Sequence, residues 1–354
     1  MSHLFSPLAL RGMTLSNRVV ISPMCQYSAE NGEATDWHLM HLGKFAISGA
    51  AMVIVEATGV TMEGRITPHC LALTNDAQEA ALARVLQFCR RHGQARMAIQ
   101  LAHAGRKGSS RRPWEPGPTL MPANGGWVPE APSAIAYSDQ GPAPRAMTLA
   151  DLERVKAAFV ASTRRALRLG FDAIEVHGAH GYLLHEFLSP LANVRDDEYG
   201  GSRENRLRYP LEVFRAMRAV WPDDRPMGVR LSAVDWADGG ITLDDTVYYA
   251  TELRKAGADW IDVSSGGLVA HQKITVGPGY QVPFSERVRR ETGATTMAVG
   301  LITEAAQAEQ ILARGQADLI AIARAALRNP HWAWHAADAL GAEIPVPPQY
   351  VRAR

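Results

Sequence analysis

The sequence predicts an α/β fold, namely a single (β/α)8 barrel of the TIM type. Short apolar runs alternate with longer amphipathic segments eight times along the 354 residues, and the runs are rich in Val, Ile and Ala, as in strands covered on both faces. An open, doubly wound sheet is the alternative, but no Gly-x-Gly-x-x-Gly pattern follows any of the runs. We therefore expect one barrel domain over residues 1–354.

The expected elements follow one another in regular order. The predicted strands are residues 18–24, 51–60, 97–104, 173–178, 227–233, 260–266, 296–301 and 319–323. The clearest helices are predicted at 76–92, 148–169, 204–221 and 244–256. Thr148 followed by Asp151 is typical of a helix start, and Gly93, Gly170 and Gly257 are typical of helix ends.

Two segments fall outside the repeat. Residues 105–145, after the third strand, are rich in Gly and Pro and have no helical period, so we expect a long loop that serves as a lid. Trp114, Trp127 and Tyr137 are expected to pack it down. Residues 344–354 are expected to leave the barrel as an extended arm.

Composition narrows the class of protein. The formal net charge is +1, so we expect neither nucleic acid nor an anionic membrane surface as a partner. Cys25, Cys70 and Cys89 include no Cys-x-x-Cys pair, which predicts neither a disulfide framework nor a zinc or iron–sulfur site. The N-terminus resembles no targeting signal and no run reaches membrane-spanning length, so a cytoplasmic enzyme is expected.

The most informative stretch is IEVHGAHGY at 174–182, where an apolar strand runs into His177, His180 and Tyr182. Neutral imidazoles and a phenol are hydrogen-bond donors that stabilise negative charge on a bound oxygen. Alone, the pattern leaves alternatives open, because His-x-x-His also suits a metal, with His103 as a further ligand, and a buried histidine can be purely structural.

Active sites of (β/α)8 barrels lie at the carboxyl ends of the strands, and polar residues follow several of these ends. Gln100 and Arg230 are placed to bind a planar ligand, although Arg230 could instead form a structural ion pair with Glu175. Backbone amides near Gly300 and Ala323, with Arg324 beside them, lie where such barrels commonly hold a phosphate.

Together these residues resemble the Old Yellow Enzyme family of FMN-dependent ene-reductases, in particular its bacterial branch with a cysteine under the flavin. The similarity spans nearly the whole chain. Its specific motifs are SPMCQY at 22–27, EATGV at 56–60, GRITP at 64–68, IQLAHAGRK at 99–107, EVHGAHGYLLHEFLSP at 175–190, DEYGGSRENR at 197–206 and VGLIT at 299–303.

The resemblance implies roles for individual positions. The implied FMN-binding residues are Ser22, Pro23, Met24, Cys25, Ala57, Gln100, Arg230, Gly300, Ala323 and Arg324. The implied substrate-binding residues are Tyr27, His177, His180, Tyr182 and, from a neighbouring subunit, Arg352. His177, His180, Tyr182 and Cys25 would be catalytic, with Tyr182 as proton donor, and no metal is implied. The family usually has Gly-Arg where this chain has Ala323-Arg324.

The implied activity is that of an NAD(P)H:acceptor oxidoreductase that uses NADPH or NADH. Hydride passes through FMN in a ping-pong cycle to an activated C=C bond of an enone, enal or nitro compound. Cys25 would tune the flavin, the alternatives being a buried filler and a redox sensor. An arginine finger in the arm implies a homodimer or homotetramer, unless the terminus is disordered.

Rival functions are less well supported by the residues. A metal-dependent barrel hydrolase often has His-x-His after its first strand, where this chain has Pro23-Met24-Cys25. A Schiff-base aldolase needs a lysine in a strand, and no predicted strand contains one. A dienoyl-CoA-type flavin dehydrogenase would need a cysteine cluster and a further domain. An idle flavin-binding protein would not need the His/His/Tyr set.

Overall fold

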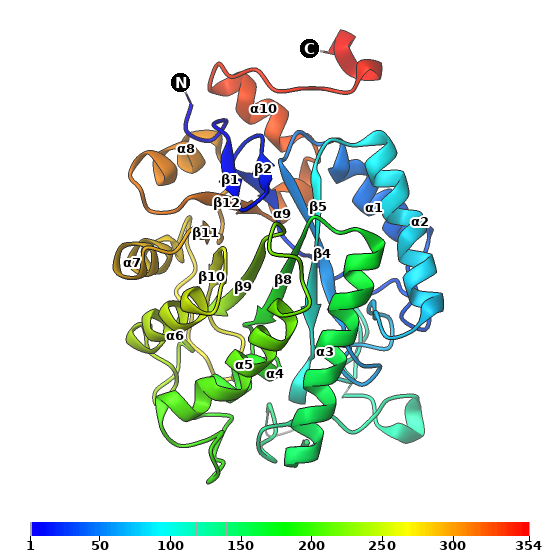
Figure 1. Ribbon diagram of the computed structural model, residues 1–354, viewed down its shortest axis with the longest axis vertical. Helices are drawn as coiled ribbons and strands as arrows, with labels where there is room; N and C mark the ends of the chain where they lie inside the picture. Colours follow the sequence, from blue (N-terminus) through cyan, green and yellow to red (C-terminus); the bar gives the residue numbers. More distant parts are fainter. Residues whose placement is uncertain (1, 118, 139–140, 354) are drawn as a thin grey trace.

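The computed structural model of the protein describes residues 2–117, 119–138 and 141–353. Within them, parallel strands form a closed barrel with helices around it (Figure 1). In chain order, which is also the order around the barrel, the strands are β3 (Val19–Ile21), β4 (Met52–Gly59), β5 (Arg96–Ala102), β8 (Ala173–Gly178), β9 (Met227–Ser232), β10 (Ile261–Ser264), β11 (Thr296–Ala298) and β12 (Leu319–Ile322). Pairing of β12 with β3 closes the sheet, so the predicted (β/α)8 barrel is confirmed.

Helices follow the barrel strands and cover the outside of the sheet. The α-helices are α1 (Asp36–Ala46), α2 (Asp76–His92), α3 (Leu149–Leu169), α4 (Leu183–Leu188), α5 (Arg203–Arg218), α6 (Leu243–Lys255), α7 (Val282–Thr292), α8 (Ala305–Ala313), α9 (Arg324–Arg328) and α10 (Trp332–Ala339). Short 3₁₀ helices are η1 (Gly105–Lys107), η2 (Pro122–Asn124) and η3 (Pro348–Ala353).

The predicted helices and their signals are confirmed, with small shifts at the ends. Thr148 caps α3 rather than belonging to it, and the backbone N–H of Asp151 donates to its Oγ1 at 3.2 Å. Gly93 and Gly170 cap the ends of α2 and α3, and Gly257 follows the end of α6. The strand predicted at 173–178 matches β8, whereas the other barrel strands end one to three residues before their predicted ends.

The barrel interior is filled from its amino-terminal end. A hairpin of β1 (Leu8–Leu10) and β2 (Met13–Leu15), which the sequence did not predict, packs its apolar side chains with Trp260, the residue before β10. A Cβ atom at Gly228 of β9 would lie 2.0 Å from Cε2 of Trp260, so this strand position admits only glycine while the indole fills the interior. The amino-terminal end is therefore a packed core, and ligand space is left at the carboxyl ends of the strands.

The lid and the arm lie at opposite ends of the molecule (Figure 1). The lid, residues 105–145, contains η1, η2 and β6 (Glu130–Ala131), and β6 pairs with β7 (Arg145–Ala146). The arm is not extended throughout as predicted, because η3 forms in it after two prolines, with the N–H of Tyr350 donating to the Pro347 carbonyl at 2.9 Å. Arg354 lies outside the described residues.

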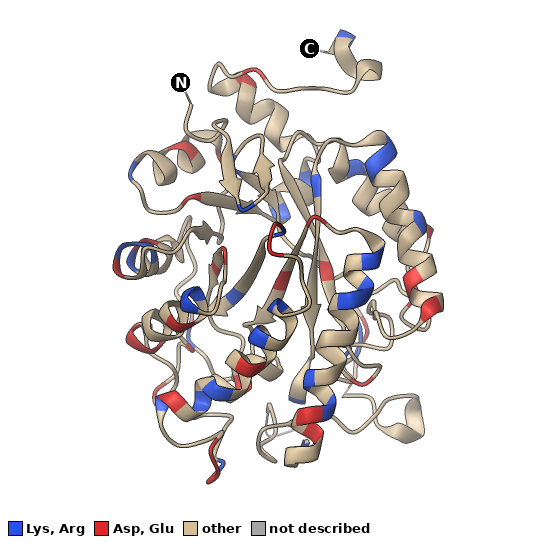
Figure 2. Ribbon diagram, viewed as in Figure 1, with Lys and Arg blue, Asp and Glu red and all other residues tan. Residues whose placement is uncertain are grey.

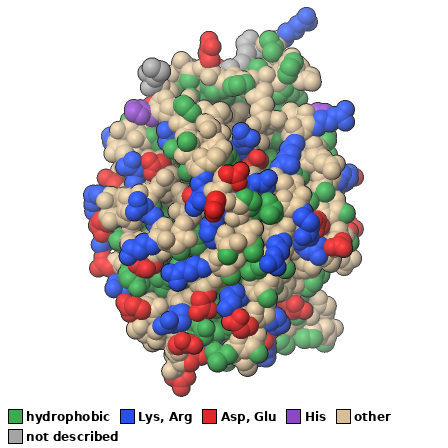
Figure 3. All heavy atoms as spheres, viewed as in Figure 1, with side chains coloured by type: hydrophobic (Ala, Val, Ile, Leu, Met, Phe, Trp, Pro, Cys, Tyr) green, Lys and Arg blue, Asp and Glu red, His purple; other side chains and the backbone are tan. Residues whose placement is uncertain are grey.

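Charged residues of both signs occur along the outer helices (Figure 2). On the face shown in Figure 3, positive and negative side chains are interspersed. This pattern agrees with the formal net charge of +1. Among the helices described, none has both the length and the apolar composition needed to cross a membrane.

Candidate active site

The register of neighbouring strands brings the predicted polar residues to one end of the barrel. His177 of β8 is level with Arg230 of β9, which is level with Asp262 of β10. Gly300 follows β11 and Arg324 follows β12 at the same end. Because all strands are parallel, residues near their carboxyl ends share one rim. The site residues that were predicted from separate sequence motifs therefore lie close together.

His177, His180 and Tyr182 form a compact cluster after β8. The ring of His177 meets those of His180 and Tyr182 edge to face, with centroids 5.2 and 4.8 Å apart. The Ala179 N–H donates to Nδ1 of His177 at 3.3 Å, so the proton of the neutral ring is on Nε2. This leaves His177 with an N–H donor directed away from its own backbone.

His180 is held at two points. Its backbone N–H donates to Ser232 Oγ at 2.9 Å, and its Nε2 lies 2.7 Å from Ser264 Oγ. Its φ of +60° places it in the left-handed region, which turns the side chain back toward His177. In this arrangement Nε2 is engaged by a serine. A ligand oxygen would therefore be bound through Nδ1 or would replace the hydroxyl of Ser264.

Burial sets the protonation states of the cluster. Burial, and then the charge of Arg230, holds the pKa of both His177 and His180 well below the usual value of an imidazole. Burial likewise raises the pKa of Tyr182 well above the usual value of a phenol. Near neutral pH the site therefore presents two uncharged imidazoles and a protonated phenol, all able to donate a hydrogen bond.

A buried pair of His185 and Asp235 supports the turn that carries the cluster. The Gly181 N–H donates to Nδ1 of His185 at 2.9 Å, and Nε2 of His185 lies 2.9 Å from Asp235 Oδ1. The other carboxylate oxygen of Asp235 accepts from Ser189 Oγ at 2.7 Å and from the Ile241 N–H at 2.9 Å. The sequence analysis missed this pair, since no local pattern joins residues so far apart in the chain.

The loop after β3 carries Cys25 and Tyr27 into the same region. Glu56 of β4 accepts from the Gln26 N–H at 2.9 Å and lies 3.0 Å from Nε2 of His38, both side chains being buried. Tyr27 adopts a left-handed φ of +53°. Burial raises the pKa of the Cys25 thiol well above its usual value, and that of the Tyr27 phenol is raised for the same reason. Both groups are therefore protonated donors.

Below this cluster, Gln100 donates to Glu175 Oε1 at 2.9 Å and Trp260 donates to Oε2 at 3.1 Å. Arg230 was expected to pair with Glu175 if its role were structural, but its Nε lies 3.2 Å from Asp262 Oδ2. The register explains the difference, because Glu175 is level with Gly228, two residues before Arg230. Burial raises the pKa of both carboxyl groups.

A cavity of about 200 Å³ opens beside this cluster. It is lined from β9 to the loops after β12 by Arg230, Ser264, Tyr280, Gln281, Val299, Gly300, Leu301, Ile302, Thr303, Ala321, Ala323, Arg324 and Ala325. Gly300 has a φ of +121°, and a Cβ there would lie 2.8 Å from Nε2 of Gln281. The cavity wall at this position is therefore backbone.

Comparison with known proteins identifies the chain's relatives. The pattern of the NADH:flavin oxidoreductase / NADH oxidase family matches residues 3–343. The chain belongs to this family. It is 48% identical over 351 residues to an NADPH dehydrogenase of Geobacillus thermodenitrificans, covering 99% of this chain and 98% of the relative. A Listeria innocua NADPH dehydrogenase is 46% identical over 355 residues, covering 100% and 99%.

Solved structures agree with this membership. Morphinone reductase superposes with a TM-score of 0.80 at 27% identity, over 98% of this chain and 92% of that one. The Old Yellow Enzyme homologue of Zymomonas mobilis gives 0.77 at 25% identity, over 97% and 94%. The resemblance to the Old Yellow Enzyme family is thus confirmed, and with it an FMN-dependent oxidoreductase that uses a nicotinamide cofactor.

The donor set at the rim suits the flavin that the family uses. Among the described residues, the buried Ser22 Oγ makes no hydrogen bond, so it has capacity for a ligand. The cavity near Gly300 and Arg324 combines backbone with an arginine, which suits a phosphate. Ala323, where the family usually has glycine, has a φ of −115°, so alanine fits there without a left-handed backbone.

The remaining predicted flavin contacts lie on the same rim. Pro23 and Met24 follow β3 directly, and Ala57 lies in β4. Nε2 of Gln26 donates to the Met24 carbonyl at 2.8 Å, which fixes the turn of this loop. Their positions agree with the predicted roles.

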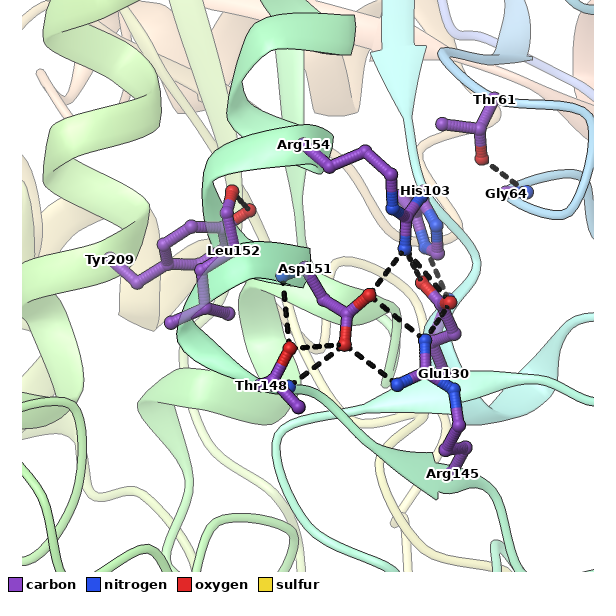
Figure 4. Close-up of polar contacts among 11 residues, drawn as sticks. Thr61, Gly64, His103, Glu130, Arg145, Thr148, Asp151, Leu152, Arg154 and Tyr209 are labelled. Atoms are coloured by element: carbon purple, nitrogen blue, oxygen red, sulfur yellow. Dashed lines mark hydrogen bonds and ion pairs between the residues drawn. The ribbon is translucent and has the colours of Figure 1, made fainter.

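The lid packs over the rim through some of the aromatic residues expected to hold it. The ring of Trp127 faces the guanidinium of Arg65 at 5.3 Å, and its backbone N–H donates to Ser109 Oγ at 2.9 Å. Trp114 is 62% exposed and touches Tyr27 edge to face at 5.7 Å between centroids. At the far end of the lid, Arg145 and Arg154 bridge Glu130 and Asp151 (Figure 4). Arg145 in particular holds the pKa of Asp151 below its usual range. The lid is tied to α3.

His103, considered as a metal ligand with His177 and His180, is buried, and its Nδ1 accepts from the Gly105 N–H at 3.2 Å. Burial lowers its pKa to about 4. In the part of the chain that the structure describes, no three His, Cys, Asp or Glu side chains are grouped as metal ligands. The geometry therefore gives the hydrolase alternative no support.

Arg352 lies in η3, at the end of the molecule away from the lid (Figure 1). Tyr350 of η3 contacts the rings of His331 and Trp334, with centroids 6.2 and 5.9 Å away. The arm is thus packed against α10 of its own chain, and Arg352 is remote from its own rim.

We predict that Asp235→Asn lowers the free energy of unfolding by about 3 kcal/mol near neutral pH, because a buried imidazole loses its charged acceptor. Burial raises the pKa of Asp235, but His185 and the other donors outweigh this and leave it below its usual value. A carboxyl with a lowered pKa stabilises the fold above its unfolded pKa and loses that contribution as the pH falls. The deficit should therefore shrink below about pH 4.

Urea unfolding of both proteins at several pH values measures this deficit. The exposed Asp238 provides the control, since Asp238→Asn should change stability by no more than about 0.5 kcal/mol. Equal losses in the two variants, or a deficit independent of pH, would contradict the assigned role of Asp235.

Proposed function

We propose that the protein reduces activated C=C bonds of enones, enals and nitroalkenes with NADPH or NADH, in a ping-pong cycle. The observation that carries the proposal is the buried cluster of His177, His180 and Tyr182 beside the cavity at Arg230. It combines two neutral donors for one oxygen with a protonated acid. When bound, FMN supplies the two-electron carrier that accepts and donates hydride.

His177 and His180 bind the carbonyl or nitro oxygen of the substrate in this proposal. Hydrogen bonds from two neutral imidazoles draw electron density toward that oxygen and make the β-carbon of the alkene electrophilic. Tyr27, whose raised pKa keeps its hydroxyl protonated, adds a donor from the opposite loop. Burial strengthens each of these hydrogen bonds, because little water is present to compete for the donors.

Tyr182 supplies the proton to the α-carbon. Its phenol is fully protonated in the working pH range because burial raises its pKa. Its ring packs against His177 at 4.8 Å between centroids, so the acid and an oxyanion donor have a fixed relation. The cluster thus polarises the carbonyl or nitro group of the substrate and supplies the proton to the α-carbon.

Cys25 acts as a neutral thiol that tunes the flavin. Its raised pKa argues against a redox sensor, since oxidation of cysteine proceeds through the thiolate. A soft S–H group near the ring system interacts differently with the oxidised and reduced forms of FMN. Replacement by alanine should therefore move the midpoint potential.

We also propose that the chain is one barrel domain, since a closed sheet uses strands from Val19 to Ile322. It works as a homodimer or homotetramer in which Arg352 reaches the site of a neighbour. This assignment is supported by the distance of η3 from its own rim (Figure 1). Free thiols at all three cysteines agree with a reducing compartment such as the cytoplasm.

An absorption experiment tests the proposed activity. Purified protein should carry flavin bands that bleach with NADPH in the absence of oxygen and return on addition of 2-cyclohexenone. Bleaching without recovery would retain the flavin oxidoreductase but reject reduction of enones. Comparison of NADPH with NADH in the first step gives the cofactor preference.

Tyr182→Phe should slow reoxidation by 2-cyclohexenone at least about 100-fold, since a positioned acid contributes that much. Flavin reduction by NADPH should change less than about threefold, because hydride transfer to the flavin needs no proton from Tyr182. Stopped-flow measurement of each half-reaction separates the two. Equal losses in both would reject Tyr182 as the donor.

Deletion of residues 344–354 should lower the rate of enone reduction about tenfold if Arg352 contributes a charged hydrogen bond to a neighbouring site. Arg352→Gln in the full chain separates the lost charge from lost assembly, and sedimentation reports the oligomer. Unchanged kinetics in both variants would show that the arm does not reach a site.

A further inference from the structure

We propose that Lys107 is a positioning residue whose ammonium group stabilises the negative charge left on Tyr182 when that phenol gives its proton to the substrate. This inference rests on the proposed function of Tyr182. Lys107 belongs to the IQLAHAGRK motif, yet the mechanism above assigns it no role. Lysine is also scarce in this chain, occurring at positions 44, 107, 156, 255 and 273 only.

The ammonium group lies between two aromatic faces. Nζ of Lys107 is 5.2 Å from the centroid of the Tyr182 ring and 4.8 Å from that of Tyr137 in the lid. It donates to the backbone carbonyls of His180 and Gly267 at 2.8 and 2.9 Å. These bonds hold the charge over Tyr182, and Tyr137 provides a second aromatic contact from the lid.

Proton transfer from Tyr182 leaves a negative charge on its phenol oxygen. The O–H bond of Tyr182 breaks, a C–H bond forms at the α-carbon, and the phenol oxygen keeps the electron pair. A tyrosinate in a buried site is costly without a nearby cation. The cation of Lys107 faces the ring on which that charge is delocalised, and it keeps its own protons. Water restores the phenol between turnovers.

Several charged groups face Lys107 and determine its titration. Arg106 precedes it in η1, and Glu186 of α4 accepts from the Arg106 N–H at 2.8 Å. Burial, partly offset by Glu186, lowers the pKa of Lys107 to about 8. Burial also raises the pKa of Glu186 to about 8, so the two groups titrate in the same range. His177 and His180, on which Lys107 also acts, are neutral there, and Tyr182 is protonated.

The main variant is Lys107→Gln, which keeps a hydrogen-bond donor for the two carbonyls and removes the charge. We expect reoxidation by 2-cyclohexenone at pH 7 to fall about tenfold, as for loss of a desolvated cation–π contact. Flavin reduction by NADPH and the dissociation constant of a phenol ligand should change less than twofold. Lys255→Gln, which removes an exposed lysine paired with Glu252, is the control for charge alone.

The pH dependence of reoxidation distinguishes loss of the Lys107 charge from a structural effect of the substitution. Reoxidation of the unaltered enzyme should slow above about pH 8 as the ammonium loses its proton, and this limb should be absent in Lys107→Gln. It should persist in Glu186→Gln, which removes the other group of similar pKa. NMR of ¹⁵Nζ-labelled lysine measures the titration directly, with Lys107→Gln assigning the signal. A limb at high pH that remains in Lys107→Gln would overturn the proposal.

A double-mutant cycle with Tyr182→Phe completes the test. Lys107→Gln should have no further effect in that background, because no tyrosinate forms. Additive losses would reject the coupling between Lys107 and Tyr182. If Tyr182→Phe alone leaves reoxidation intact, the failure belongs to the proposed proton donor and not to Lys107 alone. Loss of phenol binding in Lys107→Gln would likewise overturn the proposal, since it would indicate a collapsed site.

Discussion

Closure of the parallel barrel is the constraint on which the rest of the structure depends. Because β12 pairs with β3, no strand of the barrel has a free edge, and the carboxyl ends of all barrel strands share a single rim. Polar side chains that follow different strands are forced together there, although they lie far apart in the chain. The amino-terminal end is closed by the β1–β2 hairpin and Trp260, so the rim is where a ligand can enter.

Burial at this rim determines the chemistry of the side chains. The same desolvation that lowers the pKa of His177 and His180 raises that of Tyr182. All three become neutral donors, although imidazole and phenol have different ordinary pKa values. The Lys107 cation lies over the ring of the acid, and two carbonyls and two aromatic faces stabilise it. A neutral donor set beside a fixed cation suits a reaction in which negative charge develops only briefly.

The lid and the supporting pairs act on the same cluster from outside. His185 and Asp235 hold the turn at Gly181, and Glu56 holds the loop of Cys25 and Tyr27. Ion pairs of Arg145 with Asp151 and of Glu130 with Arg154 tie the lid to α3 (Figure 4). These contacts connect the rigid barrel to the loops that carry the reactive groups, so catalytic geometry and fold stability are linked through a few buried charges.

The sequence by itself determined the barrel, the helix ends and the residues gathered at its rim. Strand alternation, the cap at Thr148 and the motif around His177 depend on residues close together in the chain, and local physics suffices for them. The hairpin at β1 and β2, the partner of Arg230 and the pair of His185 with Asp235 were decided only by tertiary structure. Each depends on strand register or on packing between distant segments. The position of Lys107 over Tyr182 has the same origin, because residue type and spacing do not specify which ring a buried ammonium will face.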